Sequence, residues 1–209
     1  NITEDITVKA TFQKTTEEPT ENSWQNPFGD VSNDAWYYQA VQYVNQKGLM
    51  NGLGQDNFGP DDNMTRAMFV TILYRLSKDT GTYNSSFSDI ASGAWYENAV
   101  GWANAEGVVV GMGNNLFAPN DNLSREQIAL MLYNFAKYAK LDITVQNNNA
   151  LTAFNDADQV SDWAQAAMIW AVEKGYICGY NNNLDPQGNA TRAEIAQIMQ
   201  RFSEQAVAR

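Results

Sequence analysis

Apolar residues recur at helical spacing in six segments of this 209-residue chain, and two kinds of segment alternate along it. Segments of the first kind begin at a tryptophan and continue with smaller apolar residues three to four positions apart. They contain Trp36, Ala40, Val41, Val44; Trp95, Ala99, Val100, Ala103; and Trp163, Ala167, Met168, Ala171. Segments of the second kind follow a hydroxyl residue and an arginine, and contain Phe69, Val70, Leu73; Ile128, Ala129, Leu132; and Ile195, Ala196, Met199. The pattern predicts a mainly all-α fold.

The alternation reflects a repeat of the whole segment, present in three copies. Nine residues between Phe28 and Arg66 recur 59 positions later, between Phe87 and Arg125. The third copy has one extra residue before Trp163 and one fewer after Gly179. The predicted copies span residues 27–82, 86–141 and 153–206. A repeat of this size cannot bury its apolar face alone, whereas three adjacent copies can bury theirs together.

Each copy has the same internal order, which predicts a helix-loop-helix unit. An F-x-D turn precedes the first helix, and a glycine in left-handed conformation ends that helix at Gly48, Gly107 or Gly175. A second glycine and a polar loop lead to the hydroxyl–arginine step that opens the second helix. Because the second helices have the longer apolar faces, we expect them to form a shared three-helix core. The clefts between copies then form three similar grooves.

Residues 1–26 differ from the repeats and are predicted to end a preceding β repeat. Ile2 to Phe12 alternates apolar and polar residues as a strand does, and Gln13 to Gln25 has the composition of a polar linker. The chain therefore resembles a fragment of a longer protein.

Composition excludes several classes of function. The net charge of −11 argues against nucleic-acid binding, which needs a basic surface. The absence of histidine excludes Ser–His and Cys–His catalysis and histidine-based metal sites, so we expect neither a catalytic residue, a metal nor a cofactor. No apolar stretch is long enough to cross a membrane. The single cysteine, Cys178, is predicted to be a small core residue, with a reactive thiol as the alternative.

In the hydroxyl–arginine step, helix capping explains the hydroxyl residue but does not explain the arginine. The hydroxyl residues are good N-caps, and Gln127 and Glu194 complete capping boxes that Met68 cannot form. The arginines are unfavourable near the positive end of the helix dipole. They are Arg66, Arg125 and Arg192. A guanidinium beside free helix N–H groups is a good receptor for a carboxylate or phosphate, whereas the alternative is an ion pair with an aspartate or a neighbouring copy.

Three further sets of repeated residues are candidate ligand contacts, each with a structural alternative. The F-x-D aspartates accept hydrogen bonds from a ligand or cap a turn. The tryptophans are predicted either to stack on a sugar ring at the rim of a cleft or to be core residues. The second glycines are predicted either to let a ligand approach the backbone or to adopt a positive φ angle. These residues are Asp30, Asp89 and Asp156; Trp36, Trp95 and Trp163; and Gly52, Gly111 and Gly179.

In combination these motifs resemble the S-layer homology (SLH) domain family. The resemblance rests on the F-x-D turn, the W-Y step, the G-x-x-x-G segment, the F-x-P step and a T-R-A-E-like signature. The signature is intact at Thr191-Arg192-Ala193-Glu194 and altered at Thr65-Arg66-Ala67-Met68 and Ser124-Arg125-Glu126-Gln127. The resemblance covers residues 27–206 in three copies.

The resemblance implies a pseudo-threefold spindle around a central three-helix bundle, monomeric and without insertion into a membrane. It implies an extracellular module that attaches a secreted protein non-covalently to the cell wall or S-layer of a Gram-positive bacterium. The implied ligand is a secondary cell-wall polymer of the pyruvylated N-acetylmannosamine type, whose carboxylate the three arginines would bind. The aspartates, tryptophans and second glycines would complete the grooves.

Two other functions are compatible with parts of the sequence. The chain could be a structural or oligomerising module whose arginines form interface ion pairs alone. A wall hydrolase is disfavoured, because no pair of carboxylates in different environments is evident. The ligand hypothesis predicts that a variant with all three arginines changed to alanine stays folded and loses polymer binding.

Overall fold

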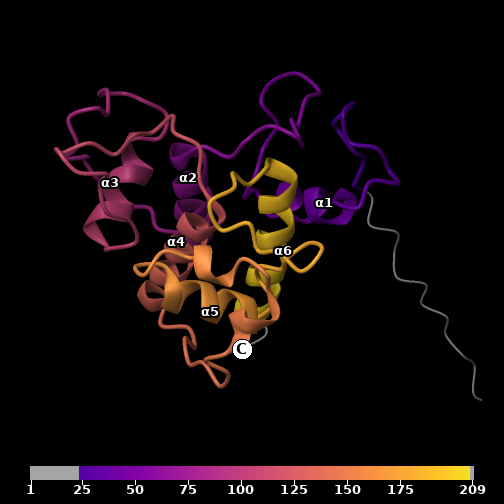
Figure 1. Ribbon diagram of the computed structural model, residues 1–209. Coiled ribbons are helices and arrows are strands. Elements are labelled where there is room, and N and C mark those ends of the chain that lie inside the picture. Colours follow the sequence, from indigo (N-terminus) through magenta and orange to yellow (C-terminus); the bar gives the residue numbers. More distant parts are fainter. Residues whose placement is uncertain (1–23, 208–209) are drawn as a thin grey trace, which may run out of the picture.

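The computed structural model describes residues 24–207 (Figure 1). The predicted N-terminal strand and most of the predicted linker lie outside these residues. Within them the chain forms six α-helices and two short 3₁₀ helices, which confirms the mainly helical fold. The elements are α1 (Tyr38–Gln46), α2 (Arg66–Ser77), α3 (Glu97–Ala105), α4 (Arg125–Tyr138), η1 (Ala150–Ala153), η2 (Ala157–Gln159), α5 (Gln165–Glu173) and α6 (Arg192–Val207).

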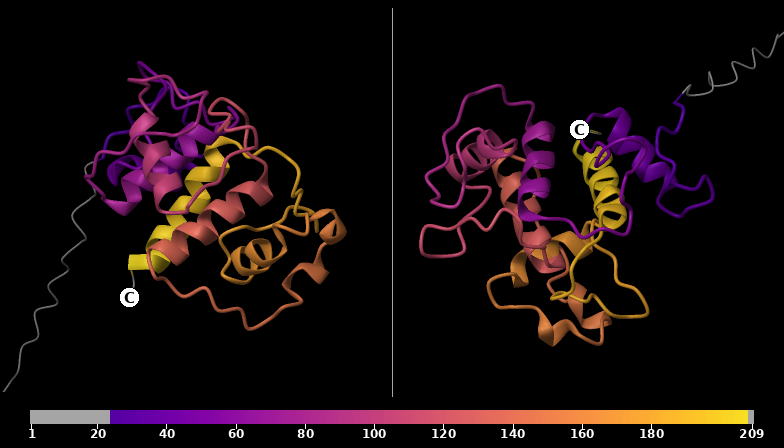
Figure 2. Two further views of the ribbon diagram at one scale, coloured as in Figure 1. Left: turned by 90° about the vertical axis from the view of Figure 1, so that its left-hand side faces the viewer. Right: turned by 90° about the horizontal axis from the view of Figure 1, so that it is seen from above.

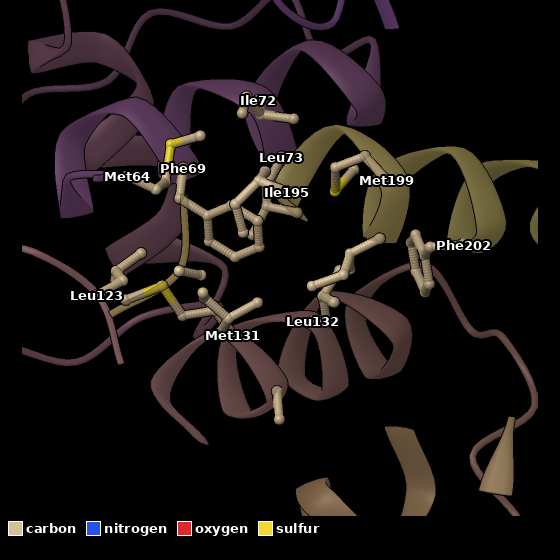
Figure 3. Close-up of a cluster of buried hydrophobic side chains, with 14 of the residues drawn as sticks. Met64, Phe69, Ile72, Leu73, Leu123, Met131, Leu132, Ile195, Met199 and Phe202 are labelled. Carbon is tan, nitrogen blue, oxygen red and sulfur yellow. The ribbon is translucent and has the colours of Figure 1, made fainter. Parts of the chain in front are cut away.

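The second helices of the three repeats, α2, α4 and α6, meet at the centre of the molecule. Figure 3 shows Phe69 of α2, Leu132 of α4 and Ile195 of α6 pointing into one cluster, and all three side chains are fully buried. Removing such apolar surface from water is the main force that holds the repeats together. The predicted three-helix core is therefore confirmed.

Each first helix packs against the second helix of the preceding repeat. Helix α3 lies against α2, α5 lies against α4, and α1 lies against α6, so that the series closes on itself (Figures 1 and 2). Seen from above in Figure 2, the three pairs form three lobes around the centre. Every lobe therefore contains residues from two repeats.

A ring of backbone hydrogen bonds closes this arrangement around the pseudo-threefold axis. The residue two positions before each signature arginine donates its N–H to the equivalent residue of another repeat. Met64 donates to Ala190 over 2.9 Å, Ala190 donates to Leu123 over 3.1 Å, and Leu123 donates to Met64 over 2.9 Å. All three residues are completely buried. Since buried backbone groups are costly to leave unpaired, the ring favours the closed three-repeat arrangement.

The termini of the helices follow the sequence signals. The side chains of Thr65, Ser124 and Thr191 each accept a hydrogen bond from the N–H three residues later. Gln127 and Glu194 return a bond to the cap residue, whereas the first repeat has no such bond, as Met68 predicts. The glycines that end the first helices have φ angles of 68°, 69° and 73°. They are Gly48, Gly107 and Gly175.

Candidate functional site

Three grooves of similar composition run along the second helices. Groove 1 has a volume of about 370 Å³ and is lined by Leu49, Met50, Asn51, Gly52, Leu53, Met68, Thr71, Ile72, Arg75, Trp95 and Arg192. Groove 2, of about 390 Å³, is lined by Arg66, Val108, Val109, Val110, Gly111, Met112, Gln127, Leu130, Met131, Asn134 and Trp163. Groove 3, of about 480 Å³, is lined by Trp36, Arg125, Tyr176, Cys178, Gly179, Tyr180, Glu194, Gln197, Ile198 and Arg201.

Every groove is assembled from all three repeats. In groove 1 the glycine is Gly52 of the first repeat, the tryptophan is Trp95 of the second and the arginine is Arg192 of the third. The other two grooves follow the same rule around the axis. They combine Gly111, Trp163 and Arg66, and Gly179, Trp36 and Arg125. The structure thus brings nine of the twelve predicted site residues together in threes.

Arg192 and Arg66 are buried cations that bridge two repeats. Arg192 donates its Nε–H to the carbonyl of Phe58 over 2.8 Å and an Nη2–H to Asn51 over 2.8 Å. Its guanidinium also lies 4.7 Å from the centre of the Phe58 ring, a favourable cation–π contact. Arg66 makes the equivalent contacts to the carbonyls of Phe117 and Val110. Burial lowers the pKa of both guanidinium groups from its ordinary value, although arginine stays charged.

Arg125 differs from the other two because it has a carboxylate partner. Its Nε–H and Nη2–H bind the carbonyls of Leu184 and Cys178, as in the other repeats. Its Nη1 forms an ion pair of 3.2 Å with Oε1 of Glu194, which belongs to the third repeat. The signature arginines form no ion pair with the F-x-D aspartates in the described part of the chain. The alternative that a signature arginine forms an ion pair therefore holds for Arg125, whose partner Glu194 belongs to a neighbouring repeat.

The N–H groups at the start of the second helices are not free. In α6 the N–H of Arg192 binds the carbonyl of Asp62 over 2.9 Å, and that of Ala193 binds Pro60 over 2.9 Å. Helices α2 and α4 make the same pair of bonds to the loop of the following repeat. The expectation that these N–H groups assist an anion is therefore wrong, because the neighbouring loop already occupies them. Only the guanidinium groups are available for that purpose.

The F-x-D aspartates fix the loops that hold the arginines. Both carboxylate oxygens of Asp156 accept backbone hydrogen bonds, from Leu184 over 2.8 Å and from Asp185 over 2.7 Å. Asp185 has a φ angle of 50°, a conformation that needs such support. The carbonyl of the same Leu184 binds Arg125, so the aspartate positions the acceptor of the arginine.

The first two repeats use their aspartates in the same way. Asp30 holds the N–H groups of Phe58 and Gly59, and Asp89 holds those of Phe117 and Ala118. Burial raises the pKa of Asp89, but the two N–H donors and nearby Arg66 outweigh it and the pKa lies below its usual value. These contacts account for the three aspartates as turn caps, and contact with a ligand remains a prediction for them.

The three repeated tryptophans lie on the surface, so the alternative that they are core residues is wrong. Trp36, Trp95 and Trp163 are 63%, 64% and 51% exposed. They lie in the turns before the first helices, two residues before each helix begins. Tyr37 and Tyr96 support the first two edge to face, at 5.2 and 5.0 Å between ring centres. Each indole thus presents an exposed face at the rim of a groove.

The second glycines are required because the F-x-D phenylalanine approaches them closely. The alternative that they adopt a positive φ angle is wrong. None of Gly52, Gly111 and Gly179 has a positive φ angle. A Cβ atom on Gly179 would lie 2.4 Å from Cε1 of Phe154 and 2.5 Å from the carbonyl oxygen of Asn183. The phenylalanine of the F-x-D turn therefore explains why a glycine recurs at this position in all three repeats.

Gly179→Ala is expected to reduce the free energy of unfolding by about 2 kcal/mol, because the methyl group overlaps both neighbours. Gly175→Ala provides the comparison, since its φ angle of 73° is strained for alanine but nothing lies within 4 Å of the added atom. Left-handed strain alone costs about 1 kcal/mol. Urea denaturation of both variants measures the difference. A larger loss for Gly175→Ala contradicts the steric explanation.

Sequence reasoning missed a second set of groove residues, nine positions after each signature arginine. Arg75, Asn134 and Arg201 occupy this position and line grooves 1, 2 and 3. With them, every arginine within residues 24–207 lines a groove. The repeat register identifies the position, but helical periodicity alone does not separate it from an ordinary solvent-facing residue.

Cys178 is exposed, so its prediction as a core residue is wrong. It lies at the position before Gly179, on the wall of groove 3, and Nη1 of Arg201 is 3.1 Å from its Sγ. The apolar character of this step therefore does not indicate burial: Val110, the equivalent residue of the second repeat, is 69% exposed.

Comparison with known proteins assigns the fold to a family. Residues 27–68, 86–129 and 153–196 match the model of the S-layer homology domain, and the chain belongs to this family. Modules of this family attach the proteins that contain them to the bacterial cell wall and are not catalytic. Among residues 24–207 no helix is long and apolar enough to span a membrane, and no acidic or cysteine cluster could hold a metal ion.

Several curated proteins contain a similar segment. The chain is 34% identical over 179 residues to an amylopullulanase of Thermoanaerobacterium thermosulfurigenes, which covers 84% of the chain but 9% of that enzyme. It is 30% identical to the S-layer protein sap of Bacillus anthracis, covering 85% of the chain and 21% of that protein. A cellulosome-anchoring protein of Acetivibrio thermocellus is 29% identical, with 93% of the chain and 41% of that protein covered. The chain thus corresponds to a minor part of each relative.

Proposed function

We propose that this cell-wall anchoring module binds an acidic secondary cell-wall polymer of the pyruvylated N-acetylmannosamine type in its three grooves. The observation that carries the proposal is the placement of charge. Every arginine of residues 24–207 lines a groove, in a chain whose net charge is −11. An anionic ligand is repelled by the chain as a whole, so its capture depends on such local cations.

The groove residues suit a sugar that carries a carboxylate. A guanidinium binds a carboxylate through charge-assisted hydrogen bonds, and the exposed indole offers an apolar face and an N–H donor to a sugar ring. The aspartates hold the loop whose carbonyl positions the arginine, and we propose that they support the groove in this way.

The relatives support the biological setting. Their names include an S-layer protein and a cellulosome-anchoring protein, both of which are surface functions. We propose that the protein acts outside the cell, on the wall of a Gram-positive bacterium. We propose a monomeric pseudo-trimer that binds neither nucleic acid nor membrane and needs no cofactor.

A hydrolytic role for the grooves receives no support from their lining. No carboxylate lines groove 1 or groove 2 in the described residues, and Glu194 of groove 3 is paired with Arg125. Glycoside hydrolysis requires two carboxylates flanking the scissile bond. The purely structural alternative has one observation in its favour, because each signature arginine bridges two repeats through backbone carbonyls.

Replacing Trp36, Trp95 and Trp163 together by alanine is expected to weaken binding to purified cell wall at least tenfold. The three side chains are more than half exposed, so the melting temperature should change little. Sedimentation with intact wall and with wall stripped of its acidic polymer measures the binding. Leu116→Ala, at a 40% exposed residue outside the grooves, is the control. Unchanged binding by the triple variant would favour the structural alternative.

A further inference from the structure

The three grooves share their architecture but differ in charge, and two positions on the second helix account for the difference. One position lies two residues after the signature arginine, and the other lies nine residues after it. The first position holds Met68, Gln127 and Glu194 in grooves 1, 2 and 3. The second holds Arg75, Asn134 and Arg201.

Groove 1 combines two cations with no lining carboxylate. Arg192 is 4% exposed, and within residues 24–207 its Nη1 has one hydrogen-bond partner, the thioether of Met68 at 4.0 Å. A thioether is a weak acceptor, so this N–H is poorly satisfied inside the protein. Arg75 is exposed and uses Nη1 to bind the carbonyl of Leu49 over 3.0 Å. The remaining N–H groups of its guanidinium are available to a ligand.

Groove 3 is lined by two arginines, Arg125 and Arg201, and also by a carboxylate, Glu194. Glu194 places Oε1 on Nη1 of Arg125 at 3.2 Å and uses Oε2 to cap the N–H of Thr191 at 2.8 Å. The carboxylate of Glu194 therefore binds Nη1 of Arg125, whereas the equivalent Nη1 of Arg192 in groove 1 faces the thioether of Met68. An anionic ligand must displace Glu194 or bind without this arginine, and either choice weakens its binding.

Groove 2 is lined by one arginine and by no carboxylate. Arg66 is 3% exposed and has Gln127 at the position of Glu194. Asn134 replaces Arg75 and makes the equivalent bond, from Nδ2 to the carbonyl of Val108 over 3.3 Å. The helix therefore accepts either side chain at this position with the same backbone contact. Exchange between arginine and asparagine here changes the charge of a groove with little change of structure.

We propose that groove 1 is the strongest of the three sites for an anionic sugar. It combines a second arginine, Arg75, which groove 2 lacks, with an uncharged residue, Met68, at the position where groove 3 has Glu194. Arg75 lines the groove together with Arg192, and Met68 places a thioether and not a carboxylate at Nη1 of Arg192. Glu194 makes groove 3 the site in which the signature arginine contributes least. This inference rests on the proposed function. It specifies in addition which groove the charged part of the polymer occupies first.

The exposed tryptophans allow each groove to be observed separately. Trp95, Trp163 and Trp36 line grooves 1, 2 and 3, so the indole N–H signals of ¹⁵N-labelled protein report on them in that order. The probe is the methyl glycoside of pyruvylated N-acetylmannosamine, and the same sugar without pyruvate is the control ligand. We expect the Trp95 signal to titrate at the lowest probe concentration, and to lose this advantage with the uncharged sugar.

Substitutions that copy the residues of the neighbouring repeats test the proposal. Arg75→Asn copies groove 2 and is expected to weaken the Trp95 titration about tenfold while the Trp36 and Trp163 titrations are unchanged. Glu194→Gln also copies groove 2 and is expected to strengthen the Trp36 titration. If Arg75→Asn leaves the Trp95 titration unchanged, or if another groove fills first, the proposal is wrong. If no indole signal responds to the probe, the proposed ligand itself is wrong.

Discussion

Arg192→Ala is expected to reduce the free energy of unfolding by about 3 kcal/mol. The substitution leaves the carbonyls of Phe58 and Asn51 without their donor and removes the guanidinium from the Phe58 ring. Hydrogen bonds to a charged group contribute about 1.5–3 kcal/mol each, and a buried acceptor without a partner adds a further cost. Denaturant-induced unfolding followed by circular dichroism measures the change.

Arg75→Ala is the matched control for this prediction. It removes an arginine from the same groove, but this side chain is exposed and its loss should cost much less than that of Arg192. Equal losses for the two variants would contradict the bridging role of Arg192. The bridging role also changes the expectation for the variant with all three signature arginines replaced by alanine, which the sequence predicts to stay folded. Because the signature arginines join the repeats, that variant should lose stability together with binding, and the tryptophan variant is the better test of function.

Asp156→Ala is expected to cost about 3 kcal/mol at neutral pH and to change how stability depends on pH. The carboxylate is 7% exposed and holds the N–H groups of Leu184 and Asp185, which the substitution leaves unpaired. Burial raises the pKa of Asp156, but the two N–H donors and Arg125 more than offset it, and the pKa is lower than usual.

The sign of the pH effect follows from this lowered pKa. A carboxylate whose pKa is lower in the folded state stabilises the protein fully above its unfolded pKa of about 4, and this stabilisation is lost as the pH falls through the folded pKa. The wild-type protein should therefore lose stability in acid more steeply than Asp156→Ala. Urea midpoints between pH 2 and pH 7 test this expectation. Asp158→Ala, which removes an exposed carboxylate two residues along the chain, is the control.

The fold was largely predictable because its determinants are local and repeated. The apolar spacing identified the six helices, the hydroxyl residues located the starts of α2, α4 and α6, and Gly48 and its equivalents located the ends of the first helices. The repeat register then made the closed three-copy core the natural way to bury the second helices. Which helices pair within a lobe was not predictable, since a hairpin within one repeat satisfies the same pattern.

Nine groove residues were predictable from the repeat, but their arrangement was not. The repeat identified Trp95 and Arg192 as candidates, yet local sequence cannot show that these residues of the second and third repeats meet in one groove. The surface position of Trp36 was also hidden, because a buried tryptophan has the same sequence signal as an exposed one. The close approach of Phe154 to Gly179 depends on the loop path and is not visible in backbone preferences.

The division of each groove among three repeats has a mechanical consequence. A pull on a ligand in groove 1 acts on Gly52, Trp95 and Arg192, and so reaches the first, second and third repeats at once. The same holds for the other two grooves. Peeling one repeat away from the bundle would remove a wall from every groove, so tension cannot be released by the partial opening of one lobe. Under force the domain is expected to hold or yield as one unit, with all three binding sites lost together.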